Sequence, residues 1–176
     1  MGWHPIGGIE GCRLRIDHDR RFPCQGSPAW DRRKRGHFNQ EIGRSAGGLT
    51  SKIHALVDAL GNPLRICLTG GNVHDLIPAL DLVSNQSADS LLGDKAYDAD
   101  QFIAKVQSQG IKIVIPPKSN RRKMRGYDHH IYKERHLVEC FFAKIKQYRR
   151  IATRYEKLAL TFRAVVLITA CLVWLE

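Results

Sequence analysis

The fold can be worked out from "SKIHALVDALGNPLRICLTG", residues 51–70, which has the pattern of two strands joined by a tight turn. Ile53, Ala55 and Val57 alternate with their neighbours, so a strand would point all three to one face. The sequence Gly61-Asn62-Pro63 is typical of a turn, and the apolar run after it suits a second strand. This stretch therefore predicts a β-hairpin.

Downstream of the hairpin, helical and strand patterns alternate. Residues 74–85 have helical spacing with Pro78 in the first turn, and SLLGD, residues 90–94, is a short strand that ends at Asp94. A helix is expected over residues 98–110, then a strand in IKIVIPP, a basic loop, and helix from Ile131. The order β-β-α-β-α-β-α predicts an α/β fold. One more strand, expected within residues 10 to 40, would complete a five-stranded ribonuclease-H-like sheet.

The charge balance favours a polyanionic partner. Lys and Arg number 28 against 17 Asp and Glu, which gives a net charge of +11. Nucleic acid explains this excess best, although ribosomal and membrane-surface proteins are equally basic. The last apolar run, AVVLITACLVWL, has 12 residues, too few for the roughly 20 that span a bilayer. We therefore expect a buried terminal helix and no membrane partner.

The cysteines indicate a reducing compartment. They are Cys12, Cys24, Cys67, Cys140 and Cys171, an odd number without a C-x-x-C pair or zinc spacing. We predict reduced thiols, mostly in the core of a cytoplasmic protein.

Residues 132–146, YKERHLVECFFAKIK, place Tyr132, Arg135, Glu139 and Lys146 in one narrow stripe of a helix, opposite an apolar stripe. By itself the pattern fits a solvated face, in which Arg135 and Glu139 at i,i+4 contribute roughly 0.2–0.5 kcal/mol. The spacing Tyr-x2-Arg-x3-Glu-x6-Lys, however, is also a functional signature.

That signature is the one found in DDE transposases of bacterial insertion sequences. The surrounding chain resembles the fifth insertion-sequence family throughout residues 41–176, in IGRSAGGLTSKIHALVDALGNPL, LTGGNVHD, LLGDKAYDAD, IPPKSNRR and YKERHLVECFFAKIKQYRRIATRYEK. The resemblance implies a ribonuclease-H-like catalytic domain, a mixed sheet flanked by helices. It also implies an enzyme that cuts and joins double-stranded DNA, both at the ends of the insertion sequence and in the target DNA. A homo-oligomer assembled on DNA is one form in which such an enzyme could act.

The resemblance also assigns a metal site. By the family pattern Asp94 is the second acidic ligand and Glu139 the third, and Asp17 is the candidate for the first. The three carboxylates would hold two Mg²⁺ ions about 3.5–4 Å apart, with Mn²⁺ as an alternative. One ion would activate water or a 3′-hydroxyl, and the other would stabilise the leaving oxygen.

The remaining members of the stripe have supporting roles by the same resemblance. Arg135 and Lys146 would bind phosphates near the metals, and Tyr132 would position the DNA backbone or stack on a base. Further basic residues are expected to follow DNA phosphates, with solvated surface charge as the alternative. They are Lys118, Arg121, Arg122, Lys123 and Arg125, with Lys144, Arg149, Arg150 and Arg154.

Other acids and histidines are predicted to be structural. Each acid fits a turn or a helix cap better than a metal site, and the histidines suit structural positions. These residues are Asp58, Asp75, Asp98 and Asp100, with His54 and His74.

The family's first-strand motif, I-D-[ST]-[ST]-x-V-[RK]-x-H-Q-H-G, is absent where it belongs. The corresponding residues 15–36 read RIDHDRRFPCQGSPAWDRRKRG, in which Asp17 follows Ile16 but the rest does not match. Rereading the codons of residues 17–31 one nucleotide downstream permits the motif, with its Asp encoded across Arg20 and Arg21. We therefore hypothesise that residues 1–40 are an irregular segment, read partly out of frame and disrupting the first strand. The catalytic domain is assigned to residues 41–176.

Two other functions stay open. The chain could be a catalytically inactive, truncated transposase that binds DNA or regulates transposition through its basic surface. A ribonuclease-H-like nuclease that acts on another nucleic acid is a weaker alternative, because the family resemblance argues against it.

Overall fold

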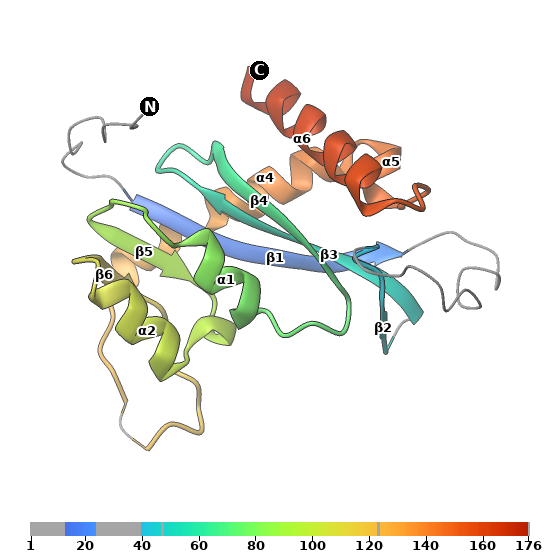
Figure 1. Cartoon of the computed structure of the whole chain (residues 1–176). Helices are drawn as coiled ribbons and strands as arrows, with labels where there is room; N and C mark the ends of the chain where they lie inside the picture. The colour runs from blue at the N-terminus through green and yellow to red at the C-terminus, as the bar shows by residue number, and fades with distance from the viewer. Residues whose placement is uncertain (1–12, 24–39, 47, 123, 176) are drawn as a thin grey trace.

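The computed structural model describes residues 13–23, 40–46, 48–122 and 124–175, and in the first of these ranges it describes only the side chain of Ile16. Within these residues six strands form one mixed sheet (Figure 1). The central strand β1 pairs antiparallel with β3 and parallel with β5, β5 pairs parallel with β6, and β3 pairs antiparallel with β2 and β4. The strands are β1 (Arg13–Pro23), β2 (Gly43–Ser45), β3 (Gly48–Val57), β4 (Pro63–Gly70), β5 (Ser90–Gly93) and β6 (Lys112–Val114).

The strand expected between residues 10 and 40 is present as β1, at the centre of the sheet. It is a strand of 11 residues, and its pairing with β3 shifts register between Asp19 and Phe22. Residues before position 41 are therefore part of the same sheet as the later strands. The family-motif stretch after Pro23 lies outside the described residues until Gln40.

The predicted hairpin is formed by β3 and β4, and its turn is held by a side chain. Asp58 Oδ1 accepts hydrogen bonds from the backbone N–H of Leu60 at 2.8 Å and of Asn62 at 2.9 Å. Gly61 has φ +91°, a conformation that favours glycine. The turn thus follows from the sequence Asp-x-x-Gly-Asn.

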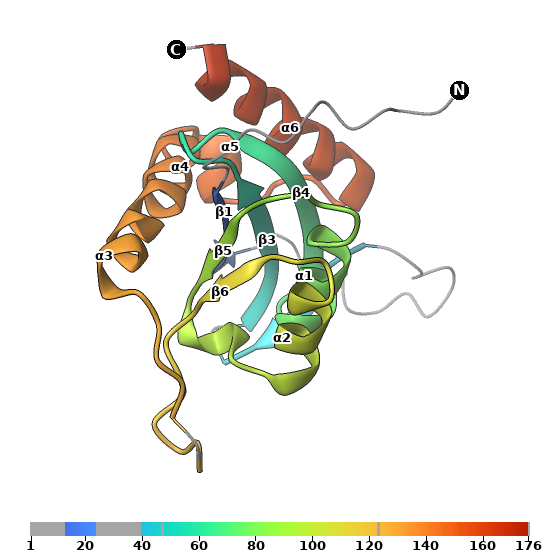
Figure 2. The same cartoon turned by 90° about the vertical axis from the view of Figure 1, so that its left-hand side faces the viewer.

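Helices cover both faces of the sheet (Figures 1 and 2). On one face, Ile16 and Leu56 pack with side chains of α1 and α2 in one core cluster. On the other face, Ile53, Ala55 and Val57 pack with side chains of α4, α5 and α6, which confirms their predicted common orientation. The helices are α1 (Leu76–Leu82), α2 (Asp100–Gln107), α3 (His129–Tyr132), α4 (His136–Lys146), α5 (Arg149–Ala152) and α6 (Ala159–Leu175), with short 3₁₀ helices η2 (Lys95–Tyr97) and η3 (Lys133–Arg135).

The terminal helix α6 is not buried as the sequence suggested. Phe162, Val166, Thr169 and Ala170 are buried, but other apolar side chains of the helix are exposed to solvent. The exposed ones are Leu160, Leu167, Ile168, Leu172, Trp174 and Leu175. One face of α6 is therefore buried, but the opposite, exposed face is apolar as well, so the helix is not amphipathic. None of the helices in the described part of the chain is long and apolar enough to cross a membrane.

The thiols differ from their predicted positions. Cys67 is half-buried, whereas Cys140 and Cys171 are free and exposed, so the expectation of mostly core cysteines is wrong for these two. Burial raises the pKa of the Cys67 thiol, and the nearby charge of Glu41 raises it further. Cys12 and Cys24 lie outside the described residues.

Arg154 was expected on a DNA-binding surface, but it is fully buried. Its guanidinium donates to the carbonyl oxygens of Gln40, Glu41, Glu156 and Lys157 and to Ser51 Oγ. It also lies over the ring of Phe162, 4.9 Å from the centroid. Arg154 therefore joins α5 and α6 to β3 and to the segment before β2, and it is unavailable to DNA.

Candidate active site

Asp94 stands at the carboxyl end of β5, where the strand meets η2. Its Oδ1 accepts a hydrogen bond of 2.6 Å from the backbone N–H of Lys95, and its carbonyl accepts one of 2.9 Å from Tyr97. The strand before it is buried, while Asp94 itself is half-exposed. The position is rigid because buried Tyr97 anchors the turn that follows. A carboxylate is thus held at the rim of the sheet.

The neighbouring strand brings position 17 to the same rim. The parallel ladder between β1 and β5 ends at the pair Ile16–Gly93, so Asp17 and Asp94 are the next residues on the two strands. Gly93 permits this close approach, because a Cβ there would lie 3.2 Å from Ile16 Cγ2. The backbone therefore puts Asp17 beside Asp94, although the Asp17 side chain lies outside the described part of the structure.

The stripe Tyr132, Arg135, Glu139 and Lys146 spans three consecutive elements rather than one regular helix. Tyr132 ends α3, Arg135 ends η3, and Glu139 and Lys146 lie on α4. Asp128 caps α3 by accepting hydrogen bonds from the backbone N–H groups of His130 and Ile131, which lower its pKa. The stretch is nevertheless continuous, because every junction residue keeps a right-handed helical backbone.

Contacts along the stripe connect Glu139, Arg135 and Tyr132. Arg135 is ion-paired with Glu139 one turn away and lies 5.8 Å from the centre of the Tyr132 ring. Burial raises the pKa of the Tyr132 hydroxyl; the charge of Arg135 lowers it, and the charge of Asp94 raises it. The charges of Arg135 and Asp94 thus both act on the Tyr132 hydroxyl. We call Asp94, Tyr132, Arg135 and Glu139 the polar cluster.

The cluster's donor set suits a hard cation. Its acids, Asp94 and Glu139, offer oxygen only, and oxygen ligands favour Mg²⁺ or Mn²⁺ over Zn²⁺. Glu139 is 54% exposed at its side chain, so a cation from solvent can reach it. Among the described residues, no group of three His, Cys, Asp or Glu is close enough to hold a metal ion. The Asp17 side chain is not described, and the structure shows only that its backbone lies beside that of Asp94.

The predicted DNA-binding residues are dispersed over several elements. Arg149 and Arg150 on α5 are exposed, as is Arg122 in the loop between β6 and α3, and Lys146 is half-buried. That loop also holds Lys118, and it projects away from the sheet in Figures 1 and 2. Arg121 is different, because it pairs with Asp98 and Asp100. Lys123 is outside the described residues.

Asp98 is a feature that the sequence did not reveal. Its fully buried side chain accepts hydrogen bonds from Arg121 Nε at 2.7 Å, Arg125 Nη2 at 2.5 Å and the Lys118 N–H at 2.8 Å. The sequence predicted only a turn or cap here. The available signal was an acid-rich segment, DKAYDAD, followed about twenty residues later by several arginines. Which acid pairs with which arginine depends on the tertiary fold.

The remaining acids and histidines are structural, although not always as predicted. Asp58 holds a turn, and His54 is buried with Nε2 at 2.8 Å from Thr69 Oγ1. Asp75 occupies the predicted cap position of α1, but it makes no side-chain cap bond and instead pairs with buried Lys52 at 2.8 Å. Asp100 lies inside the first turn of α2, where Ala99 is the cap, so the cap prediction is wrong for Asp100.

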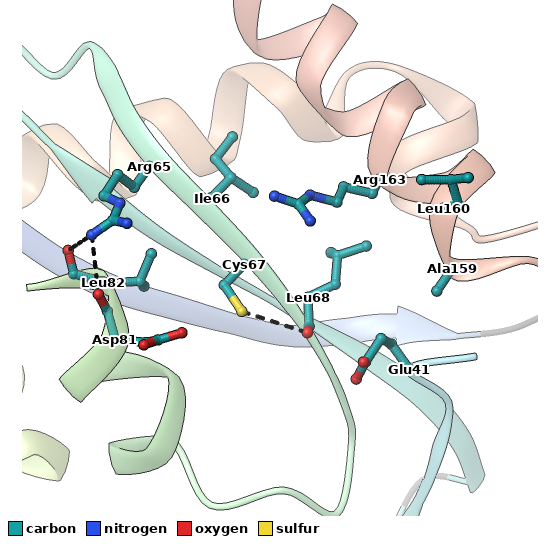
Figure 3. A pocket seen from close by; sticks show the side chains of 10 residues that line it. All are labelled: Glu41, Arg65, Ile66, Cys67, Leu68, Asp81, Leu82, Ala159, Leu160 and Arg163. Atoms are coloured by element: carbon teal, nitrogen blue, oxygen red, sulfur yellow. Dashed lines mark hydrogen bonds between the residues drawn. The ribbon is translucent and has the colours of Figure 1, made fainter. Parts of the chain in front are cut away.

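A cavity of about 500 Å³ lies elsewhere, along the edge strand β4 between α1 and α6 (Figure 3). It is lined by Glu41, Arg65, Ile66, Cys67, Leu68, Asp81, Leu82, Ala159, Leu160 and Arg163. Arg65 reaches across to the end of α1, where its Nη1 donates to the carbonyl oxygens of Asp81, Leu82 and Ser84. None of these residues belongs to the polar cluster, because β3 and β1 separate β4 from β5.

The fold and the cluster define a class of protein. A mixed sheet in this strand order, with Asp94 at the end of β5 and Glu139 on a helix that packs against the sheet, is the ribonuclease-H-like layout expected from the sequence. The description "Transposase DDE domain" belongs to the family model that matches residues 12–174. The chain belongs to this transposase family, the class encoded by bacterial insertion sequences.

Relatives and a solved structure agree with this family. The chain is 42% identical over 131 residues to a candidate transposase for insertion sequence element IS6501 from Brucella ovis, covering 73% of this chain and 100% of that protein. It is 30% identical over 159 residues to a candidate transposase for element IS402 from Burkholderia cepacia, covering 84% and 71%.

A solved piggyBac transposase synaptic complex with hairpin DNA superposes with a TM-score of 0.53 at 12% identity, over 93% of this chain. The chain spans 46% of that structure's length, and at this identity the likeness concerns the fold. The ribonuclease-H-like fold expected from the sequence is confirmed.

Proposed function

We propose that this chain cuts and transfers DNA strands at the ends of its insertion sequence, with Asp94 and Glu139 as the acids of the active site. The single observation that carries the proposal is that α4, the helix with Glu139, packs against β1, the strand whose ladder with β5 ends one residue before Asp94. Arg135 is ion-paired with Glu139, and the charge of Asp94 acts on Tyr132 of the same stripe. Two segments that are far apart along the chain thus lie in one region of the fold.

Asp94, Glu139 and Asp17 would hold two Mg²⁺ or Mn²⁺ ions, and these ions would activate the attacking hydroxyl and stabilise the leaving oxygen. Support comes from the oxygen-only donors and from the placement of Asp17 next to Asp94 in the β1–β5 register. Asp94 is fixed by its bond from Lys95, whereas Glu139 is exposed on α4. The two acids would thus be offered by a strand end and by a helix that packs against the neighbouring strand β1.

The chain's basic groups would bind and orient DNA around this pair of acids. Arg135 holds Glu139 and is positioned to contact a phosphate beside it. The half-buried Tyr132 packs edge-on against Tyr127, with ring centres 5.4 Å apart, so it presents a fixed aromatic edge to a DNA backbone or base. Exposed Arg149, Arg150 and Arg122 would extend the phosphate contacts beyond the cluster.

A second candidate is a DNA-binding chain without catalytic activity. The observation that favours it is the missing first-strand motif after Asp17, which the out-of-frame hypothesis explains. In that case the basic surface and the fold would be kept while the first ligand is lost. The nucleotide sequence of the first 35 codons decides the hypothesis, since an absent motif in the shifted frame would contradict it.

Strand cleavage tests the proposal directly. The substrate is a plasmid that carries the coding sequence with its flanking DNA, incubated with the full chain and Mg²⁺. We expect metal-dependent breaks at the flanks, reduced at least about a hundredfold by Asp94→Asn and by Glu139→Gln. Asp100→Asn, which removes an exposed acid outside the cluster, is the control. DNA binding without cleavage, unchanged by either substitution, would support the second candidate.

A further inference from the structure

A buried carboxylate fastens the basic loop of this protein to the turn that follows Asp94. Asp98 has a fully buried side chain and accepts hydrogen bonds from Arg121 Nε, Arg125 Nη2 and the Lys118 N–H, at 2.5–2.8 Å. All three donors belong to the loop between β6 and α3. Buried charges are costly unless paired, so this arrangement fixes where the loop can lie.

The fastening point is connected to Asp94 by a short, stiff piece of backbone. Between the two acids lies η2, in which Tyr97 N–H donates to the Asp94 carbonyl at 2.9 Å and Asp98 N–H donates to the Lys95 carbonyl at 3.1 Å. Tyr97 is completely buried and packs against Phe102 of α2, with ring centres 5.9 Å apart. The turn is thus held by its own backbone bonds and by Tyr97, and it keeps Asp98 at a fixed position four residues from Asp94.

The other end of the loop leads into the stripe. Asp128 begins α3, which passes through η3 to Arg135 and Glu139. The loop thus starts after β6 and is held by Asp98 in its middle. It leads through α3 and η3 into α4, which carries Glu139. Between the two arginines that pair with Asp98, Arg121 and Arg125, the side chains of Arg122 and Met124 are exposed to solvent.

Asp100 provides an internal comparison. It also pairs with Arg121, but its side chain is 89% exposed, so solvent screens the pair and its contribution is small. Asp98 is 0% exposed and has two arginine partners. The two acids are two residues apart on the same segment, yet only Asp98 can act as a clamp.

We infer that Asp98 is a positioning residue that holds the described part of the basic loop, residues 116–122 and 124–128, in a fixed place near Asp94 before DNA arrives. This inference rests on the proposed function, because it gives the loop a role in engaging DNA near the active-site acids. A loop that is already ordered loses less conformational freedom when it binds phosphates. Asp98 therefore contributes to DNA affinity without touching DNA or the reacting atoms.

Trypsin cleavage after Arg121 and Arg125 tests the clamp without any DNA. The variants are Asp98→Asn, whose amide oxygen can still accept from Lys118 but which lacks the charge, and Asp100→Asn as the matched control. We expect cleavage at these two bonds to rise at least tenfold in Asp98→Asn and less than twofold in Asp100→Asn. Equal cleavage rates in the two variants would overturn the clamp, whatever the protein does to DNA.

DNA binding then tests the positioning role. We expect the Kd of Asp98→Asn for the plasmid-derived flanking DNA to rise about tenfold, while the single-turnover cleavage rate at saturating DNA stays within about twofold. An unchanged Kd with a loosened loop would overturn the positioning role. If the wild-type chain neither binds nor cuts this DNA, the proposed function fails, and the trypsin comparison still decides the clamp. Should Asp98→Asn not fold, Arg125→Gln removes one arm of the clamp, and trypsin cleavage after Arg121 should then rise at least tenfold, whereas an unchanged rate would overturn the clamp.

Discussion

Replacement of Arg154 is predicted to destabilise the whole domain, although the residue is an arginine in a strongly basic chain. The guanidinium has five N–H donors, and five acceptors surround it: four backbone carbonyls and Ser51 Oγ, at 2.5–3.2 Å. The acceptors belong to segments far apart in the sequence, before β2, on β3 and between α5 and α6. One side chain thus satisfies three separate parts of the fold.

The expected cost follows from those five bonds. An acceptor that loses its partner while buried costs about 1–3 kcal/mol, but carbonyls at Gln40, Glu41 and Glu156 are only partly covered and can rehydrate. We therefore expect Arg154→Met, which keeps the length of the side chain, to lower the free energy of unfolding by about 3–5 kcal/mol. For a chain of this size that corresponds to a loss of roughly 6–20 °C in Tm.

Thermal unfolding followed by circular dichroism measures this effect, with urea titration as a second assay. Arg150→Met is the control, because Arg150 is 73% exposed and its nearest acid, Glu156, lies at 3.8 Å. The control should change the free energy of unfolding by about 0.5 kcal/mol or less. If Arg154→Met unfolds within 2 °C of the wild type, by about the same amount as the control, the reasoning from satisfied donors is refuted.

Two further predictions concern packing and thiol chemistry. A Cβ at Gly71 would lie 2.0 Å from Thr50 Oγ1, so Gly71→Ala should destabilise the domain by about 1–3 kcal/mol in urea titration, and an unchanged midpoint would contradict the close contact. Burial raises the pKa of Cys67, so its thiolate fraction at pH 8 is reduced. Iodoacetamide should modify Cys67 more slowly than exposed Cys140, and its rate should keep rising above the ordinary thiol pKa; equal rates by peptide mass spectrometry would refute this.

The sequence was sufficient for most of the fold because local patterns agreed with the tertiary structure. Alternation in residues 51–57 and the Gly61 turn predict the hairpin, and the short run before Asp94 predicts β5. The stripe on residues 132–146 predicts a helical segment, but the 3₁₀ turn at Lys133–Arg135 is not visible in the hydrophobic pattern. Local signals thus determined the elements better than their exact geometry.

Long-range interactions explain what the sequence could not show. In the sequence Arg154 resembles a DNA-binding arginine, but its buried partners include Ser51 and the carbonyls of Gln40 and Glu41, all more than a hundred residues earlier. Asp98 fits a simple turn until Arg121 and Arg125 approach it from another part of the chain. The α6 prediction failed for a related reason, since apolar composition does not say how many neighbours a helix will have.

The role of Asp94 and Glu139 as acids of one metal site is the central claim, and Mn²⁺ binding to the full chain tests it most directly. Calorimetric titration with Mn²⁺ alone should show binding to the wild type that weakens at least about tenfold in Asp94→Asn and likewise in Glu139→Gln, while Asp100→Asn binds as the wild type does. Mn²⁺ affinity that is the same in the wild type, Asp94→Asn and Glu139→Gln would contradict the claim.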